Sequence, residues 1–92
     1  MKESEIEKKS RLYAESLGIV VRKFTSPSRT GVPDRIFVGP KGVYFIEFKK
    51  PGEKLEPIQK YEIGKLNTAR GEPCAFWCDN FESAKAIIDQ LL

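Results

Sequence analysis

Two acidic residues and a lysine lie at the ends of two apolar segments in the middle of the chain. Asp34 comes directly before the segment RIFVG, while Glu47 and Lys49 lie at the end of the segment VYFIEFK. Residues 39–42, Gly-Pro-Lys-Gly, separate the two segments and predict a tight hairpin. If the strands pair symmetrically about residues 40 and 41, Asp34 lies opposite Glu47, with the two Cβ atoms roughly 5 Å apart.

These residue types at this spacing indicate metal-assisted hydrolysis. Two carboxylates so close repel each other when both are ionised, so they must share a proton or bind a cation. Mg²⁺ suits the pair, because it takes one or two carboxylates and keeps several waters. Lys49 projects from the same strand face as Glu47, where its amine can orient a water or stabilise developing negative charge. Taken singly, such residues are usually solvated strand ends, but the whole combination argues for a site.

The composition excludes several other chemistries. The chain of 92 residues contains no histidine, which rules out Ser-His-Asp and Cys-His mechanisms. Its two cysteines, Cys74 and Cys78, are too few for a metal site and are expected to be reduced, buried thiols. The net charge of +3 is compatible with a polyanionic partner. Because no apolar run could span a membrane and the N-terminus is charged, we expect one cytoplasmic domain over residues 1–92.

Hydrophobic periodicity and turn residues predict the elements that position these groups. Helices are expected over residues 3–17, from Pro57 to about Thr68, and from Asn80 or Phe81 to Leu92. Strands are expected over residues 19–24, 35–39, 43–49 and 73–78. The order α-β-β-β-α-β-α predicts an α/β fold with a mixed sheet flanked by helices, in which a crossover makes the fourth strand parallel to the third.

Three motifs in order resemble the virus-type replication-repair nuclease (VRR-NUC) domain of the PD-(D/E)xK nuclease superfamily. That domain has the pattern G-x-P-D, E-x-K and a downstream glutamine; here residues 31–34 are GVPD, residues 47–49 are EFK, and Gln59 follows. The resemblance spans nearly the whole chain and implies a stand-alone, phage-like member. It also implies a restriction-endonuclease-like α-β-β-β-α-β core and Mg²⁺- or Mn²⁺-dependent hydrolysis of DNA phosphodiester bonds, with no organic cofactor.

The resemblance implies a role for each motif residue. Asp34 and Glu47 would be metal ligands, and the backbone carbonyl of Phe48 would be a further one. Lys49 would serve the attacking water. Gln59, at the start of the second long helix, would support the site or touch a phosphate.

The family also implies an acid on the first helix. Glu3 best fits the family's spacing to the glycine at Gly18, and Glu7 lies one turn later on the same helix face. We favour Glu3 and keep Glu7 as the alternative. A run of Glu and Lys at this place is otherwise an ordinary solvated helix face.

DNA is the expected partner, held through its backbone. Phosphate contacts position a protein without reading sequence, so we expect recognition of DNA structure. The loop TSPSRTG, residues 25–31, is expected to be flexible and to contact DNA. The basic residues that flank the acids and the lysine are Lys23, Arg29, Arg35, Lys50, Lys54 and Lys60.

The main hypothesis is a structure-selective DNA endonuclease similar to Holliday-junction resolvases. Such enzymes act as two-fold dimers, so a homodimer is expected. It would bury some of Phe24, Phe76, Trp77 or the terminal pair Leu91-Leu92. If phage-encoded, the protein would act in the host cytoplasm. One alternative is a flap or nicking nuclease of the same fold. Another is a non-catalytic DNA-binding module, although such a module usually lacks an acid or the lysine.

Overall fold

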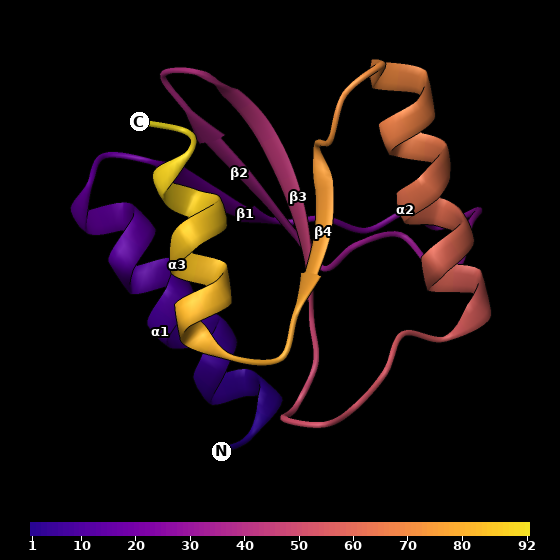
Figure 1. Cartoon of the computed structure of the whole chain (residues 1–92), viewed down its shortest axis with the longest axis horizontal. Coiled ribbons are helices and arrows are strands. Elements are labelled where there is room, and N and C mark those ends of the chain that lie inside the picture. Colours follow the sequence, from indigo (N-terminus) through magenta and orange to yellow (C-terminus); the bar gives the residue numbers. More distant parts are fainter.

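A computed structural model describes all residues, 1–92, and has the predicted order of three helices and four strands (Figure 1). The elements are α1 (Glu3–Ser16), β1 (Val20–Lys23), β2 (Arg35–Gly39), β3 (Gly42–Phe48), α2 (Pro57–Arg70), β4 (Ala75–Cys78) and α3 (Phe81–Asp89). The predicted α/β class is therefore confirmed. The last helix ends at Asp89 rather than at Leu92, because Leu91 leaves the helix and enters the core with only 1% of its surface exposed.

The four strands form one mixed sheet in the order β1-β2-β3-β4. β1, β2 and β3 are antiparallel neighbours, and β4 is parallel to β3 after the α2 crossover. The predicted hairpin register is confirmed, with Gly39 opposite Gly42 and Ile36 opposite Phe45. The ladder ends at the pair Arg35 and Ile46, so the next two residues to face each other are the candidate acids.

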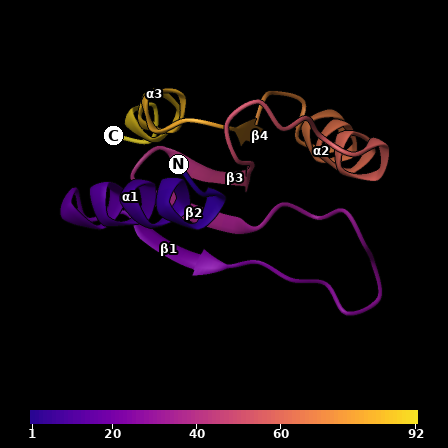
Figure 2. The same cartoon turned by 90° about the horizontal axis from the view of Figure 1, so that it is seen from below.

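The sheet has helices on both sides (Figures 1 and 2). α1 and α3 lie against each other on one side, and α2 lies on the other side, along β4. The core lies between the sheet and the α1–α3 pair, and its main members are Ile6, Ala14, Val21, Phe37, Ile46, Phe48, Cys78, Ala84 and Ile88. Because successive side chains of a strand alternate between faces, the residues of β3 between these core positions point toward the α2 side.

The remaining sequence expectations concern the thiols and the membrane. Cys74 and Cys78 are free and buried as predicted, and burial raises the pKa of the Cys78 thiol to about 12. Asn80 caps α3, because its side-chain oxygen accepts a hydrogen bond from the Ser83 amide at 2.8 Å. None of the three helices combines the length and apolar character needed to cross a membrane.

Candidate active site

Asp34 is held at the point where the β2–β3 ladder ends. Its carboxylate oxygen Oδ2 accepts a hydrogen bond from the backbone N–H of Phe48 at 3.1 Å. Its backbone carbonyl accepts another from the Phe24 amide at 2.8 Å, which joins the end of β1 to the same place. The preceding Pro33 is fully buried and fixes the backbone dihedral φ there. The side chain is thus tied to β3 although Asp34 itself lies outside the strand.

Glu47 and Lys49 lie on the α2 side of the sheet and are buried. Only 5% of Glu47 and 6% of Lys49 is exposed. Gln59, in the first turn of α2, donates a hydrogen bond from Nε2 to Glu47 Oε2 at 3.3 Å. Its Oε1 accepts from the backbone N–H of Glu56 at 2.9 Å, as part of the capping box that begins α2. The box therefore fixes which end of the Gln59 amide faces Glu47.

The charges at this point are not balanced by the chain itself. The pKa of Glu47 is raised from 4.5 to about 8, mainly by burial and then by the negative charge of Asp34. Lys49 opposes this rise only in part. A divalent cation between the two acids would keep both ionised, and their oxygens are the donors that Mg²⁺ and Mn²⁺ prefer.

The acidic side chains do not form a complete cage for a metal. No group of three or more His, Cys, Asp or Glu side chains lies close enough to hold one. A hard cation at Asp34 and Glu47 would therefore take its other ligands from a backbone carbonyl, such as that of Phe48, and from water. This arrangement suits Mg²⁺, which ordinarily keeps several waters and uses one or two carboxylates.

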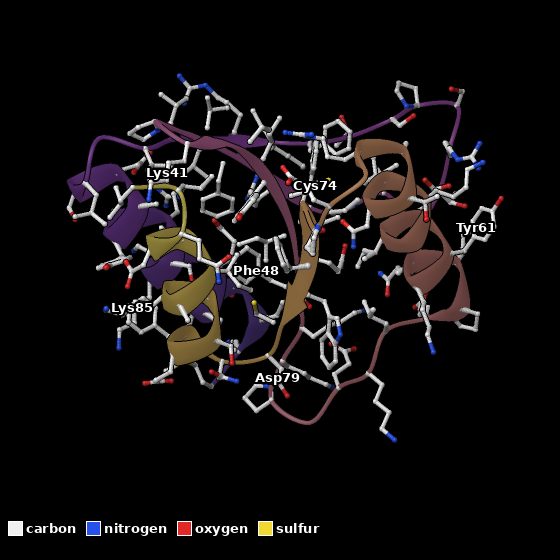
Figure 3. The ribbon with its side chains drawn as sticks, turned by 45° about the horizontal axis from the view of Figure 1, so that its top comes forward. Lys41, Phe48, Tyr61, Cys74, Asp79 and Lys85 are labelled. Carbon is white, nitrogen blue, oxygen red and sulfur yellow. The ribbon has the colours of Figure 1, made fainter.

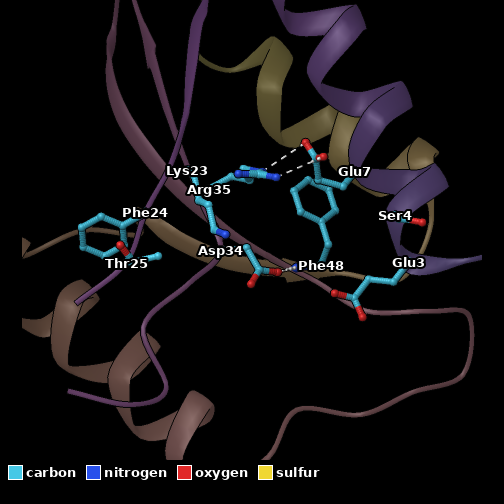
Figure 4. A pocket seen from close by; sticks show the side chains of 9 residues that line it. All are labelled: Glu3, Ser4, Glu7, Lys23, Phe24, Thr25, Asp34, Arg35 and Phe48. Atoms are coloured by element: carbon cyan, nitrogen blue, oxygen red, sulfur yellow. Dashed lines mark hydrogen bonds and ion pairs between the residues drawn. The ribbon is translucent and has the colours of Figure 1, made fainter. Parts of the chain in front are cut away.

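The two candidate acids of α1 differ in their surroundings. Both line a cleft of ≈ 500 Å³ that also contains Asp34 (Figure 4). Glu7 forms ion pairs with Arg35 at 3.2 Å and with Arg11 at 3.6 Å. Glu3 forms none, and its pKa is raised by partial burial first and by the charge of Asp34 next. Of the two carboxylates, that of Glu3 is the one free to join the site.

The six basic residues expected to hold DNA divide into two groups. Arg29 is ion-paired with the buried Glu62 of α2, and Arg35 with Glu7 of α1. The other four have no carboxylate within ion-pair distance and are Lys23, Lys50, Lys54 and Lys60. The lysines are therefore the cations of this set that remain free for phosphate.

The loop between β1 and β2 is anchored to α2. Besides the Arg29–Glu62 ion pair, the loop backbone at Gly31 comes so close to α2 that a Cβ there would lie 2.8 Å from the Ile58 carbonyl oxygen. The sequence reasoning did not identify Glu62. Its position four residues after Ile58 and four before Leu66 puts it on an apolar helix face, a signal that could have drawn attention to it.

The residues expected at a dimer interface differ from one another in how far they are buried. Phe24 packs on Phe45 with ring centroids 5.1 Å apart, and Phe76 packs on Tyr44 at 4.9 Å. Leu91 belongs to the core, so the prediction that the whole terminal leucine pair could form an interface is wrong for this residue. The larger exposed members of the expected set are Trp77 and Leu92.

Comparisons with known proteins agree with the motif pattern. No family model matches the chain. A protein of Acyrthosiphon pisum secondary endosymbiont phage 1, named "Putative nuclease p44", is 42% identical over 67 residues, which cover 72% of this chain and 72% of that protein. A solved structure described as a "VRR_NUC domain" aligns with a TM-score of 0.82 and 29% identity over 100% of this chain and 99% of its own.

A second solved structure, a "VRR_NUC domain protein", aligns with a TM-score of 0.75 over 99% of this chain and 88% of its own. Its sequence is 18% identical, so it supports the fold alone.

Proposed function

Because the chain belongs to the virus-type replication-repair nuclease family, we propose that it is a divalent-metal-dependent DNA endonuclease selective for branched DNA, as Holliday-junction resolvases are. The nuclease activity is supported by the phage relative and by the structural neighbours. The observation that carries the proposal is the cluster at the end of β3, where Asp34 bonds to the β3 backbone and Gln59 bonds to Glu47 beside the buried Lys49.

The proposed direct metal ligands are Asp34, Glu47 and the Phe48 carbonyl. Glu3, the further acid of the site, is not close enough to complete a group of three carboxylates and would act through water. When bound there, Mg²⁺ or Mn²⁺ would lower the pKa of water and offset negative charge on the scissile phosphate. Gln59 keeps Glu47 in one orientation through its hydrogen bond and through the capping box behind it. The burial of Glu47 and Lys49 limits the water that competes for these contacts.

We propose that Lys49 holds the attacking water and stabilises the negative charge that develops on the phosphate. Hydrolysis forms a bond from water oxygen to phosphorus and breaks the bond from phosphorus to the leaving oxygen, which takes up a proton. An ammonium group on the same strand face as Glu47 can hold the water in line and stabilise the negative charge of the transition state. The four lysines without ion-pair partners would bind the DNA backbone nearby.

We propose that the active form is a homodimer. A junction is resolved by two symmetric cuts, and each chain carries one candidate site. Two-fold dimers are the commonest soluble oligomers and match the symmetry of a four-way junction. Analytical ultracentrifugation at the protein concentration of the cleavage assay measures this directly, and a monomer that still makes paired cuts would contradict it.

The test of the function is cleavage of labelled four-way junction, flap, splayed-arm and plain duplex DNA of shared sequence, in Mg²⁺, Mn²⁺ or EDTA. We expect symmetric cuts in opposite strands of the four-way junction, and none in EDTA. Cuts confined to flaps would keep the nuclease and reject the resolvase. DNA binding without cleavage in either metal would make the protein a binding module.

A further inference from the structure

The only tryptophan of the chain lies beside the proposed site. Trp77 of β4 is the register partner of Glu47 in the parallel pairing with β3. Paired residues of neighbouring strands share a face of the sheet, and the strands are about 4.8 Å apart. The next pair along, Cys78 with Phe48, lies in the core between the sheet and α1–α3. Trp77 therefore projects on the opposite face, the one that carries Glu47 and Lys49.

The indole of Trp77 is exposed, unlike most of β4. Trp77 is 40% exposed, while Ala75 and Cys78 in the same strand are buried. None of the aromatic pairs, cation–π contacts or side-chain hydrogen bonds involves Trp77. Tryptophan is on average a highly buried residue. An exposed indole that makes none of these contacts, next to a buried acid and lysine, is available to a ligand.

Unpaired lysines lie in the loop near the end of β4, alongside the acids Glu53 and Glu56. The loop that follows β3 contains Lys50 and Lys54, which have no ion-pair partners. This loop is attached to the end of β4, because the Gly52 amide donates a hydrogen bond to Asp79 Oδ2 at 3.1 Å. Asp79 is only two residues beyond Trp77. β4 is also an edge strand, so no further strand covers its outer side.

Unpaired nucleic-acid bases stack on exposed aromatic rings, and lysines without ion-pair partners bind the phosphate backbone beside them. We propose that Trp77 stacks on an unpaired nucleobase of the substrate and thereby selects branched over plain duplex DNA. This inference rests on the proposed function. Bases inside a duplex are covered by their neighbours, whereas bases at a splayed arm, flap or open junction can leave the stack at little cost. Stacking is tolerant of sequence, so Trp77 would recognise structure alone.

Because Trp77 is the only tryptophan, its fluorescence reports this contact without any cleavage. The wild-type protein is titrated in EDTA with splayed-arm DNA and with blunt duplex DNA of equal length. Anisotropy of the labelled DNA measures binding in the same samples. We expect splayed-arm DNA to quench the emission over the concentration range in which it binds, and duplex DNA to leave it nearly unchanged.

Two variants and one control separate stacking from general binding. Trp77→Ala is expected to raise the Kd for splayed-arm DNA about 10-fold and that for duplex less than about twofold. Trp77→Phe keeps an aromatic ring and should retain most of the affinity for splayed-arm DNA. This variant shows whether the loss in Trp77→Ala comes from the missing ring or from a defect in folding. Tyr61→Ala removes another exposed aromatic, on the outer side of α2 (Figure 3), and should change neither Kd.

The outcomes that overturn the inference differ from those that overturn the function. Unquenched emission while splayed-arm DNA binds, or an equal loss of affinity for both DNAs in Trp77→Ala, would overturn the stacking role. Emission that depends on protein concentration and not on DNA would do the same, since a second copy of the chain would then cover Trp77. In each case metal-dependent cleavage by the wild type would leave the proposed function intact.

Discussion

At the scale of single residues, the site depends on a buried carboxylate whose charge the chain does not fully balance. Glu47 lies beside Asp34 and, more distantly, Glu3, and Lys49 offsets their effect only in part. Burial and repulsion together hold the pKa of Glu47 at about 8 when no cation is bound. Below that pH the folded protein keeps a proton on Glu47 that the unfolded chain releases near pH 4.5, and this links stability to pH.

The first prediction concerns this linkage. A raised carboxyl pKa contributes stability that is complete below about pH 4.5 and is lost as the pH rises through about 8. Glu47→Gln cannot ionise, so in EDTA its Tm should exceed that of the wild type at pH 9 and nearly equal it at pH 5. Mg²⁺ at pH 9 should raise the Tm of the wild type only. Parallel pH profiles of the two proteins in a thermal melt would contradict this.

The second prediction separates the two glutamates of α1. Glu3→Gln should lower the cleavage rate at least about tenfold with little change in Tm, since its carboxylate has no ion-pair partner. Glu7→Gln leaves Arg35 without its partner, so we expect about 1–2 kcal/mol of lost stability and cleavage close to wild type. Chemical denaturation and single-turnover cleavage of both variants measure this. Loss of cleavage in Glu7→Gln alone would show that Glu7, and not Glu3, is the helix acid of the site.

At the scale of secondary-structure elements, the β2–β3 hairpin and helix α2 position the residues of the site. The hairpin register sets Asp34 against the end of β3, and α2 supplies Gln59 through its capping box. The loop between β1 and β2 joins these parts, because it carries Asp34 at one end and rests on α2 through Gly31 and through the Arg29–Glu62 ion pair. A change in the packing of this loop on α2 should therefore displace both Asp34 and Gln59, the two neighbours of Glu47.

The third prediction tests this loop at Gly31. Gly31 has φ +84° and no room for a Cβ, whereas Gly52 has φ +81° and nothing within 4 Å. Gly31→Ala should therefore lower the free energy of unfolding by about 1–3 kcal/mol more than Gly52→Ala, which suffers the backbone strain alone. Urea denaturation of the two variants compares the costs. Equal losses would show that the close approach to Ile58 has no energetic weight.

The elements were largely predictable from the sequence because their signals are local. Strand alternation and the Gly39–Gly42 turn were enough to give the hairpin register, and with it the Asp34–Glu47 pairing. The Arg29–Glu62 ion pair was not predictable, since its partners are 33 residues apart on a loop and a helix. The end of α3 was predicted too late because Leu91 continues the apolar pattern while leaving the helix to reach the core. Tertiary packing, which the sequence pattern does not show, decides both this ion pair and the end of α3.

At the scale of the whole molecule, the arrangement of charges distinguishes residues that stabilise the fold from those free to bind a polyanion. Arg11, Arg29, Arg35, Arg70 and Lys85 are paired with carboxylates of the chain. The lysines that follow the candidate site in the sequence, Lys50, Lys54 and Lys60, are not. Because the net charge is only +3, we expect DNA binding to depend on where unpaired cations such as these lie.

The fourth prediction concerns salt dependence. Each lysine that binds a phosphate releases counterions, so removing it should reduce the slope of log K against log salt by about 1. We expect this for Lys54→Ala and Lys60→Ala, and an unchanged slope for Arg70→Ala, whose guanidinium is already paired with Glu72 at 3.0 Å. Anisotropy titrations of junction DNA in EDTA at several salt concentrations give the slopes. A reduced slope in Arg70→Ala, with none in the lysine variants, would contradict this assignment.

The most direct test of the proposed site is the rate of DNA cleavage by Lys49→Ala, measured in Mg²⁺ and in EDTA beside the wild type. Lys41→Ala is the matched control, because Lys41 is an exposed lysine in the turn at the other end of the same hairpin (Figure 3). We expect wild type and Lys41→Ala to cleave in Mg²⁺ alone, and Lys49→Ala to be slower by about 100-fold or more while binding DNA normally. Unchanged cleavage by a folded Lys49→Ala, or cleavage by the wild type in EDTA, would contradict a metal-dependent site at the end of β3.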